Sequence, residues 1–210
     1  MLLTGSDFTN PEKIWSMACR FGPPPKRWDL IYVCVPSRDN EIRKSWDLAR
    51  ACMLKLCDEL GLRVLLVGHT DFGGSPGDGI ELRGVLPQKE LLECIARSRV
   101  AFFPNIIDPS PRVISQALCL DVPILVNRSI LGGWHYVTAS TGRFFEDESD
   151  VVAGAHACLT DSFEPLAWFR GKHGPENSSR RLARLLSLVR RQGDDDPGAE
   201  VGAAAQQPSG

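Results

Sequence analysis

An acidic residue and a neutral amide stand eight positions apart between two apolar runs. The segment AFFPNIIDPSPRVISQALCLDVPILV (101–126) places Asp108 after the first run and Gln116 in a helix-like stretch. Ser110 followed by Pro111 is typical of an N-cap and the first residue of a helix. Carboxylates accept hydrogen bonds from sugar hydroxyls, and the free N–H groups at a helix start bind phosphate. The pattern therefore suits a site for a sugar and a phosphate, although a simple helix cap with a turn would look the same.

Length and charge limit the classes of protein to consider. The chain has 210 residues and a mass of 23.1 kDa, which suits one domain. Its net charge of −2 and pI near 6.1 give no general attraction to nucleic acid or to anionic membranes. No apolar run approaches the ~20 residues of a membrane span, and the N-terminus lacks the pattern of a signal peptide. We therefore expect a cytoplasmic protein without a membrane span.

The cysteines and histidines give no pattern of a metal site or a disulfide framework. Seven cysteines are present, most of them in apolar surroundings, and none belongs to a CxxC pair. The four histidines have no ligand spacing with these cysteines. We expect reduced thiols in the core, no metal and no tightly bound cofactor.

Apolar runs alternate with helix-like segments along the chain. Strands are expected at 29–35, 63–68, 80–86, 100–104 and 122–126, with a short one ending at Phe145. Helices are expected at 41–60, 87–98, 111–120, 148–160, about 163–170 and 177–191, the last capped by Asn177 or Ser178. This alternation predicts an α/β fold, a doubly wound parallel sheet of the Rossmann-like kind. Ligands of such sheets lie outside the carboxyl ends of the strands.

Three regions follow from the same pattern. Residues 1–28 predict a leading helix with Pro11 at its first position, and then a proline-rich linker. Residues 29–191 form the domain. Residues 192–210 lack large apolar side chains almost entirely, so we expect this tail to be disordered.

The segment FFPNIIDPSPRVISQALCLDVPILVN resembles the donor-site segment of retaining GT-B glycosyltransferases of family 4. That family has two acids eight positions apart, and they correspond to Asp108 and Gln116. The resemblance implies that Asp108 contacts the donor sugar and that Gln116 faces the ribose. Two departures stand out, because the second acid is here a glutamine and Asp121 replaces a usual glycine.

Other segments resemble the same family in the same order, and the likeness covers about residues 29–190. LIYVCVPSRDNEIRKSWDLARACMLKL is similar to its first strand and helix, which implies that Arg38 and Lys44, or Arg43 in place of Lys44, bind the donor diphosphate. Asp108, Arg38 and Lys44 are thus the expected catalytic residues. The residues implied in nucleotide-sugar binding are Gly68, Leu86, Pro87, Gln88, Asn105, Ser110, Pro111, Arg112, Gln116, Gly132 and Gly133. Beside the two glycines, Trp134 is expected in the core.

The expected function is binding of a nucleotide-sugar donor for glycosyl transfer to an acceptor that the sequence does not identify. GT-B enzymes have two Rossmann-like domains, and this chain resembles the C-terminal, donor-binding half. The missing half is expected from a separate chain or from a second copy. The alternative is a non-catalytic module derived from such an enzyme. A dinucleotide-dependent reductase is disfavoured, because no G-x-G-x-x-G follows the first strand.

Overall fold

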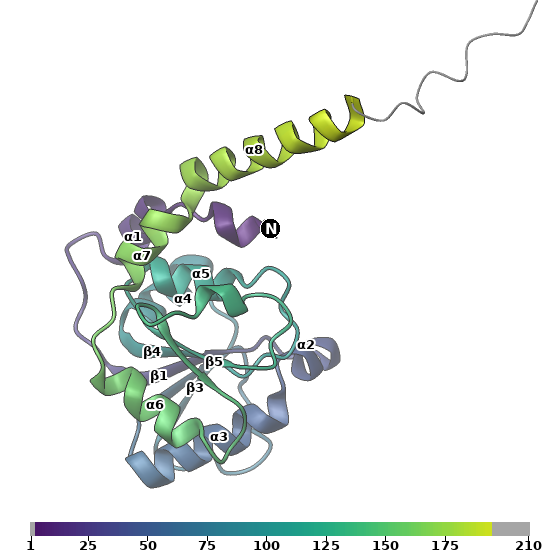
Figure 1. Cartoon of the computed structure of the whole chain (residues 1–210). Coiled ribbons are helices and arrows are strands. Elements are labelled where there is room, and N and C mark those ends of the chain that lie inside the picture. The colour runs from purple at the N-terminus through teal and green to yellow at the C-terminus, as the bar shows by residue number, and fades with distance from the viewer. Residues whose placement is uncertain (1–2, 195–210) are drawn as a thin grey trace, which may run out of the picture.

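A six-stranded parallel sheet forms the centre of the protein (Figure 1). The structure is a computed structural model that describes residues 3–194, with side chains described up to residue 190. The strands lie in the order β3-β2-β1-β4-β5-β6, and all neighbours are parallel. Their bounds are Trp28–Val33 (β1), Val64–Val67 (β2), Ile80–Arg83 (β3), Ser98–Phe103 (β4), Ile124–Asn127 (β5) and Gly142–Phe145 (β6). The predicted doubly wound parallel sheet is confirmed.

Helices cover both faces of this sheet, and two short 3-10 helices (η) lie at its carboxyl edge. The 3-10 helices are Gly5–Phe8 (η1) and Trp134–Tyr136 (η2). The α-helices are Pro11–Ala18 (α1), Arg38–Arg43 (α2), Trp46–Leu60 (α3), Gln88–Ala96 (α4), Arg112–Cys119 (α5), Val151–Thr160 (α6), Pro165–Lys172 (α7) and Gly174–Asp194 (α8). The tail predicted at 192–210 lies, from residue 195 on, outside the described residues.

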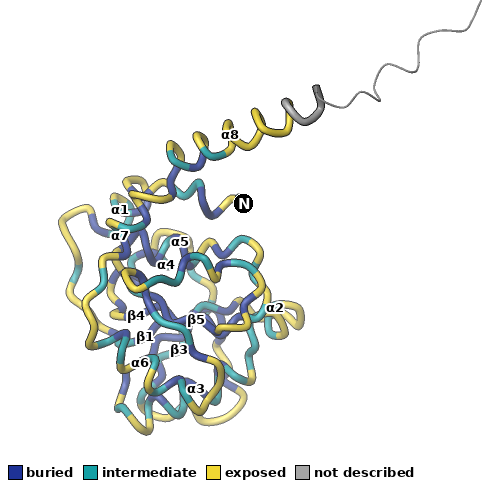
Figure 2. Tube along the Cα trace, viewed as in Figure 1, coloured by how far each residue is buried: buried dark blue, intermediate teal, exposed yellow. Residues whose placement is uncertain are grey.

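Two apolar cores lie on opposite faces of the sheet, and Figure 2 shows the strands as the most buried part of the chain. Ile31 of β1 packs on the face covered by α1, α4, α5 and α7, whereas Leu30 and Tyr32 pack on the face of α3 and α6. Side chains alternate between faces along a strand, so a strand buried on both sides consists of apolar residues throughout. This is why the sequence locates the strands well.

The helix predicted at 41–60 is wrong in one respect, because the chain forms two helices with a break at Ser45. Ser45 adopts a left-handed conformation with φ of 49°. The carbonyl of Lys44 accepts a hydrogen bond from the Tyr32 hydroxyl (3.0 Å), and that of Arg43 accepts from the N–H of Ile106 (2.9 Å). These long-range bonds engage carbonyls that one continuous helix would use internally. The short α2 therefore stands as a separate element at the carboxyl edge.

Buried thiols fill part of both cores. Six of the seven cysteines are buried and Cys57 is half-buried. Burial raises the pKa of Cys52 and Cys158 to about 12, so these thiols stay protonated and act as small apolar side chains. Within residues 3–194, no group of three or more His, Cys, Asp or Glu side chains is arranged to hold a metal ion.

No helix in the described part of the chain has the length and apolar character needed to cross a membrane.

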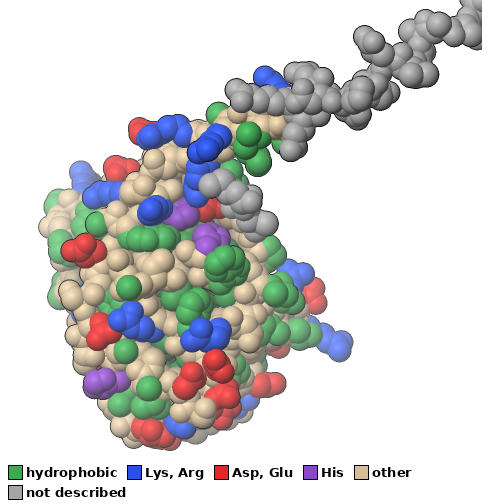
Figure 3. All heavy atoms as spheres, in the orientation of Figure 1, with side chains coloured by type: hydrophobic (Ala, Val, Ile, Leu, Met, Phe, Trp, Pro, Cys, Tyr) green, Lys and Arg blue, Asp and Glu red, His purple; other side chains and the backbone are tan. Residues whose placement is uncertain are grey.

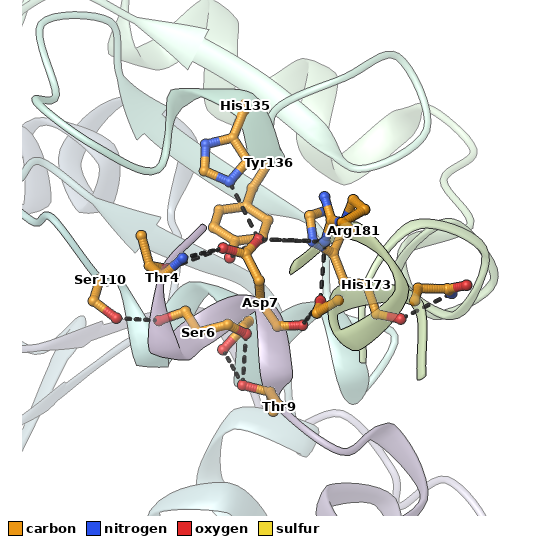
Figure 4. Close-up of polar contacts among 12 residues, drawn as sticks. Thr4, Ser6, Asp7, Thr9, Ser110, His135, Tyr136, His173 and Arg181 are labelled. Carbon is orange, nitrogen blue, oxygen red and sulfur yellow. Dashed lines mark hydrogen bonds and ion pairs between the residues drawn. The ribbon is translucent and has the colours of Figure 1, made fainter. Parts of the chain in front are cut away.

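A buried carboxylate ties the N-terminal segment to the domain (Figure 4). Asp7 is 1% exposed, and its Oδ1 accepts hydrogen bonds from the Tyr136 hydroxyl (3.0 Å) and His173 Nδ1 (2.8 Å). Its Oδ2 accepts from the backbone N–H of Thr4 (2.7 Å), and His135 Nε2 lies 3.6 Å from Oδ1. Burial alone would raise the pKa of Asp7, but these hydrogen bonds hold it well below its usual range. The ionised carboxylate thus joins η1, η2 and the segment before α8.

The start of α8 is attached to the same place. The Ser178 hydroxyl donates to the carbonyl of Asp7 (2.6 Å). The Asn177 amide donates to the carbonyls of Arg170 (2.8 Å) and His173 (3.0 Å), which end α7. The capping role expected for Asn177 or Ser178 is therefore wrong, because α8 begins earlier, at Gly174, and both side chains anchor it to the domain.

Replacing Asp7 by asparagine should destabilise the fold by roughly 3 kcal/mol. The asparagine amide group carries two N–H donors in place of one carboxylate oxygen, and these would face the buried groups that donate to Asp7. Since the folded-state pKa of Asp7 is lowered, its stabilising contribution is complete above the ordinary pKa of 3.8 and declines only below it. Urea unfolding at neutral pH measures the loss. Asp58→Asn, on an exposed position of α3, is the matched control and should leave stability within about 0.5 kcal/mol. Equal losses in both variants would contradict the role of Asp7.

Candidate functional site

The loops after β1 and β4 meet at the point where the sheet reverses its winding. β1 and β4 are neighbours, and the chain moves from β1 toward β2 on one side and from β4 toward β5 on the other. Loops that diverge in this way leave a crevice at the carboxyl edge, where ligands of doubly wound sheets lie. Here the N–H groups of Ile106 and Ile107 donate to the carbonyl of Arg43 (2.9 and 3.2 Å). Candidate residues from two distant segments are thereby brought together.

Lys44, Asn105 and Asp108 form a polar cluster at this crevice, which we call the Asp108 cluster. Asn105 is 1% exposed and donates through Nδ2 to Oδ2 of the half-buried Asp108 (3.0 Å). Lys44 donates through Nζ to the carbonyl of Val33 (3.0 Å), at the end of β1. Burial raises the pKa of Asp108, and the charge of Lys44 and the Asn105 hydrogen bond offset part of that rise. The cluster offers a hydrogen-bond acceptor, Asp108, that feels the charge of Lys44.

The loop after β5 closes on the Asp108 cluster through its backbone. The N–H of Asp108 donates to the carbonyl of Leu131 (3.0 Å), and the N–H of Leu131 donates to the carbonyl of Ile106 (2.8 Å). Gly132 has φ of +93°, and a Cβ at this position would lie 2.5 Å from the carbonyl oxygen of Asp108. Only glycine fits such a conformation and approach. Gly132 therefore lets the loop after β5 lie directly against the backbone of Asp108.

The start of α5 differs from the expectation. The helix begins at Arg112 after Pro111, and no side chain caps it, so the N-cap role predicted for Ser110 is wrong. The Ser110 hydroxyl instead lies 3.0 Å from that of Ser6 in η1 (Figure 4). Pro111 is buried, with Gly133 packed against it, whereas Arg112 is exposed. The N-terminal segment and the Gly133 loop thus enclose the start of α5, and Arg112 remains open to a ligand.

The other predicted residues form no side-chain hydrogen bond or ion pair with the Asp108 cluster within residues 3–190. Arg38 is exposed on α2, where it lines a surface hollow together with Trp46. Gly68 follows β2 with φ of +114° and packs against the backbone of Cys34. Gln116 is half-buried, and no hydrogen bond of its side chain is formed within residues 3–190. The loop of Leu86, Pro87 and Gln88 follows the edge strand β3, three strands away from β4.

Exposed apolar side chains gather in the segments that follow the strands. Trp134, expected in the core, is instead 60% exposed. Ile107 (38%) is exposed in the loop after β4, and Leu131 (67%) is exposed in the loop after β5. Val35, Ile42 and Val85 are further exposed apolar residues after β1 and β3. We call these six residues the apolar rim.

The Asp7 contacts could not be predicted from spacing in the sequence. Thr4 to Asp7 has the letters T-G-S-D, a capping-box pattern that the structure contains, and this was the one local signal. The partners Tyr136 and His173 lie more than a hundred residues away, and no spacing connects them with Asp7.

No protein-family model matches the chain, and no curated protein matches it. Solved structures do share its fold. Sucrose-phosphate synthase from Thermosynechococcus elongatus is 16% identical, with a TM-score of 0.59 over 88% of this chain and 52% of that one. A trehalose-6-phosphate protein from E. coli bound with UDP-2-fluoro glucose is 12% identical, with a TM-score of 0.65 over 85% and 50%. A putative UDP-N-acetylglucosamine 2-epimerase from Listeria monocytogenes is 17% identical, with a TM-score of 0.56 over 86% and 52%.

These likenesses show the fold, at identities too low to show more. They match the Rossmann-like class expected of a GT-B C-terminal half. The chain spans about half the length of each of these structures.

Substituting Gly132 by alanine should destabilise the protein by about 2 kcal/mol or more, since the Cβ would overlap the Asp108 carbonyl and the positive φ would be strained. Gly171→Ala in α7 is the control, because nothing lies within 4 Å of a Cβ there and alanine favours the helix. Urea unfolding compares the two variants. A Gly132→Ala protein as stable as wild type would contradict the described approach of the two loops.

Proposed function

We propose that this chain is a glycosyltransferase-type domain that binds a nucleotide-sugar donor at the carboxyl edge of its sheet. The observation that carries the proposal is the Asp108 cluster, in which the charge of a lysine acts on a carboxylate at the reversal point of the winding. Two of the structures with this fold support it through their own ligands and names, since one is bound with UDP-2-fluoro glucose and one is a sucrose-phosphate synthase. A retaining mechanism and a relationship to family 4 remain part of the proposal.

Each group of the donor has a chemical partner at the crevice. Lys44 and the exposed Arg38 and Arg112 would neutralise the diphosphate, and they would stabilise the charge that develops as the nucleoside diphosphate departs. Asp108 would accept hydrogen bonds from sugar hydroxyls. The donor must be extended to reach from Asp108 to the Leu86–Gln88 loop, which would contact the base. No metal is assigned to this chemistry.

Transfer would require a second protein surface over the crevice. Glycosyl transfer needs donor and acceptor held in line and shielded from water. The apolar rim would be buried by such a surface, as exposed apolar patches beside polar sites are in protein interfaces. Because the chain spans about half of the similar structures, we assign this surface to an N-terminal half of the same kind or to a second copy.

Calorimetric titration with a panel of nucleoside diphosphates and their sugars tests the proposal. We expect affinities in the micromolar to millimolar range, which corresponds to roughly 4 to 8 kcal/mol. Arg38→Ala combined with Lys44→Ala should weaken every diphosphate by about tenfold or more, because charge-assisted contacts are lost. Lys172→Ala, an exposed lysine at the end of α7, should change nothing. Unchanged affinity in the double variant, with an unchanged thermal melt, would remove the phosphate assignment.

The position of Gln116 is tested by Gln116→Glu. If this side chain faces the ribose, the carboxylate should strengthen binding by about 1 kcal/mol, or roughly fivefold. The gain should vanish for a 2′,3′-dideoxyribose diphosphate, which lacks the hydroxyl donors. Titration of both ligands, with a thermal melt of the free protein, separates the possibilities. A lower melting temperature without tighter binding would place Gln116 in the core instead.

A further inference from the structure

The long helix α8 leaves the body of the protein after its first two turns (Figure 1). Ser178 donates to the carbonyl of Asp7, and Arg181 lies 4.0 Å from the Asp7 carboxylate, so the start of α8 is held firmly. From Leu182 to Arg190 every residue is exposed. Figure 3 shows apolar and basic side chains along this free part of the helix. None of these residues has a role in the proposed function.

The free part of α8 has one apolar side. Leu182, Leu185, Leu186 and Val189 recur at the i, i+3, i+4 and i+7 spacing of one helix face. Their exposed fractions are 38%, 36%, 52% and 57%, and Leu188, 50% exposed, lies beside them. A stripe of this size is unfavourable in water unless another surface covers it.

Arginines lie outside the apolar stripe of the helix. Between positions 177 and 193 the sequence contains five arginines and no aspartate or glutamate. Arg184 falls opposite the apolar stripe, and Arg190 flanks it at the helical spacing of 100° per residue. The whole chain has a net charge of −2, so this positive charge is a local feature of α8. The next acidic residue in the sequence, Asp194, comes five positions after Val189, which is more than one helical turn.

We propose that α8 binds the surface of a membrane that contains anionic lipids. The helix would lie in the plane of the interface, with the leucine stripe among the acyl chains and the arginines at the phosphate headgroups. This arrangement gives both sides of α8 a complementary environment.

A second copy of the chain suits the same helix less well. Two α8 helices packed through their stripes would place arginines along both flanks of the interface, where paired helices usually carry opposite charges. The 177–193 segment supplies no acidic partner for them. Anionic headgroups supply one for Arg184 and Arg190, whereas Arg181 and Arg180 already lie 4.0 Å and 3.9 Å from Asp7 and Glu176.

Co-sedimentation of the full chain with lipid vesicles tests the proposal. We expect binding to phosphatidylcholine vesicles that contain phosphatidylserine, much weaker binding to phosphatidylcholine alone, and loss of binding at high salt. Leu185→Asp with Val189→Asp should weaken binding at least about tenfold for each side chain, because each loses the burial of an apolar group. Arg184→Gln with Arg190→Gln should weaken binding about fivefold for each charge, and only to the anionic vesicles.

Phe21→Asp is the matched control, because Phe21 is 94% exposed and lies outside α8, and it should bind vesicles like wild type. Circular dichroism and thermal melts confirm that each variant is folded. Absence of wild-type binding to the anionic vesicles, or equal binding of the Leu185→Asp, Val189→Asp protein, would overturn the proposal. Sedimentation velocity completes the test. If the wild-type protein does not bind vesicles but forms a dimer, and the Leu185→Asp, Val189→Asp protein does not dimerise, the stripe belongs to an interface with a second copy.

Discussion

The carbonyl of Arg43 accepts backbone hydrogen bonds from Ile106 and Ile107, and the candidate site depends on this contact. The contact draws the end of α2 to the loop after β4 and coincides with the break at Ser45. Lys44 is thereby placed at the end of β1, where its charge acts on Asp108. A continuous helix from residue 41 to 60 would not provide this arrangement. A broken helix is thus the condition for a cation and a carboxylate to share the crevice.

A second constraint acts on the same loop from the other side. The N–H of Asp108 donates to Leu131, the N–H of Leu131 donates to Ile106, and Gly132 allows the two backbones to approach closely. The N-terminal segment adds a third support, because Ser6 reaches Ser110 while Asp7 anchors the same segment to Tyr136 and His173. The site is therefore supported by segments from both ends of the chain, and its geometry relies on backbone contacts more than on side-chain pairs.

The sequence predicts the sheet well and the site only partly, for physical reasons. Strands buried on both faces must be apolar throughout, so apolar runs such as 63–68 can be recognised as strands in the sequence. Glycines with positive φ, such as Gly132, also stand out, since other residues rarely adopt that conformation. The break at Ser45, the exposure of Trp134 and the partner of Ser110 could not be predicted from the sequence. Each depends on contacts between segments distant in the chain, which no local pattern encodes.

The most direct test is to map amide chemical shifts by NMR while a nucleoside diphosphate is titrated into the full chain. Binding at the crevice predicts the largest changes in Val35–Lys44, Asn105–Arg112 and Leu131–Gly133, which lie far apart in sequence and meet only in the folded protein. Changes confined to the opposite, amino edge of the sheet, such as the hollow lined by Arg63 and Asp78, would contradict the assignment. A protein in which no amide responded at millimolar ligand would contradict it as well.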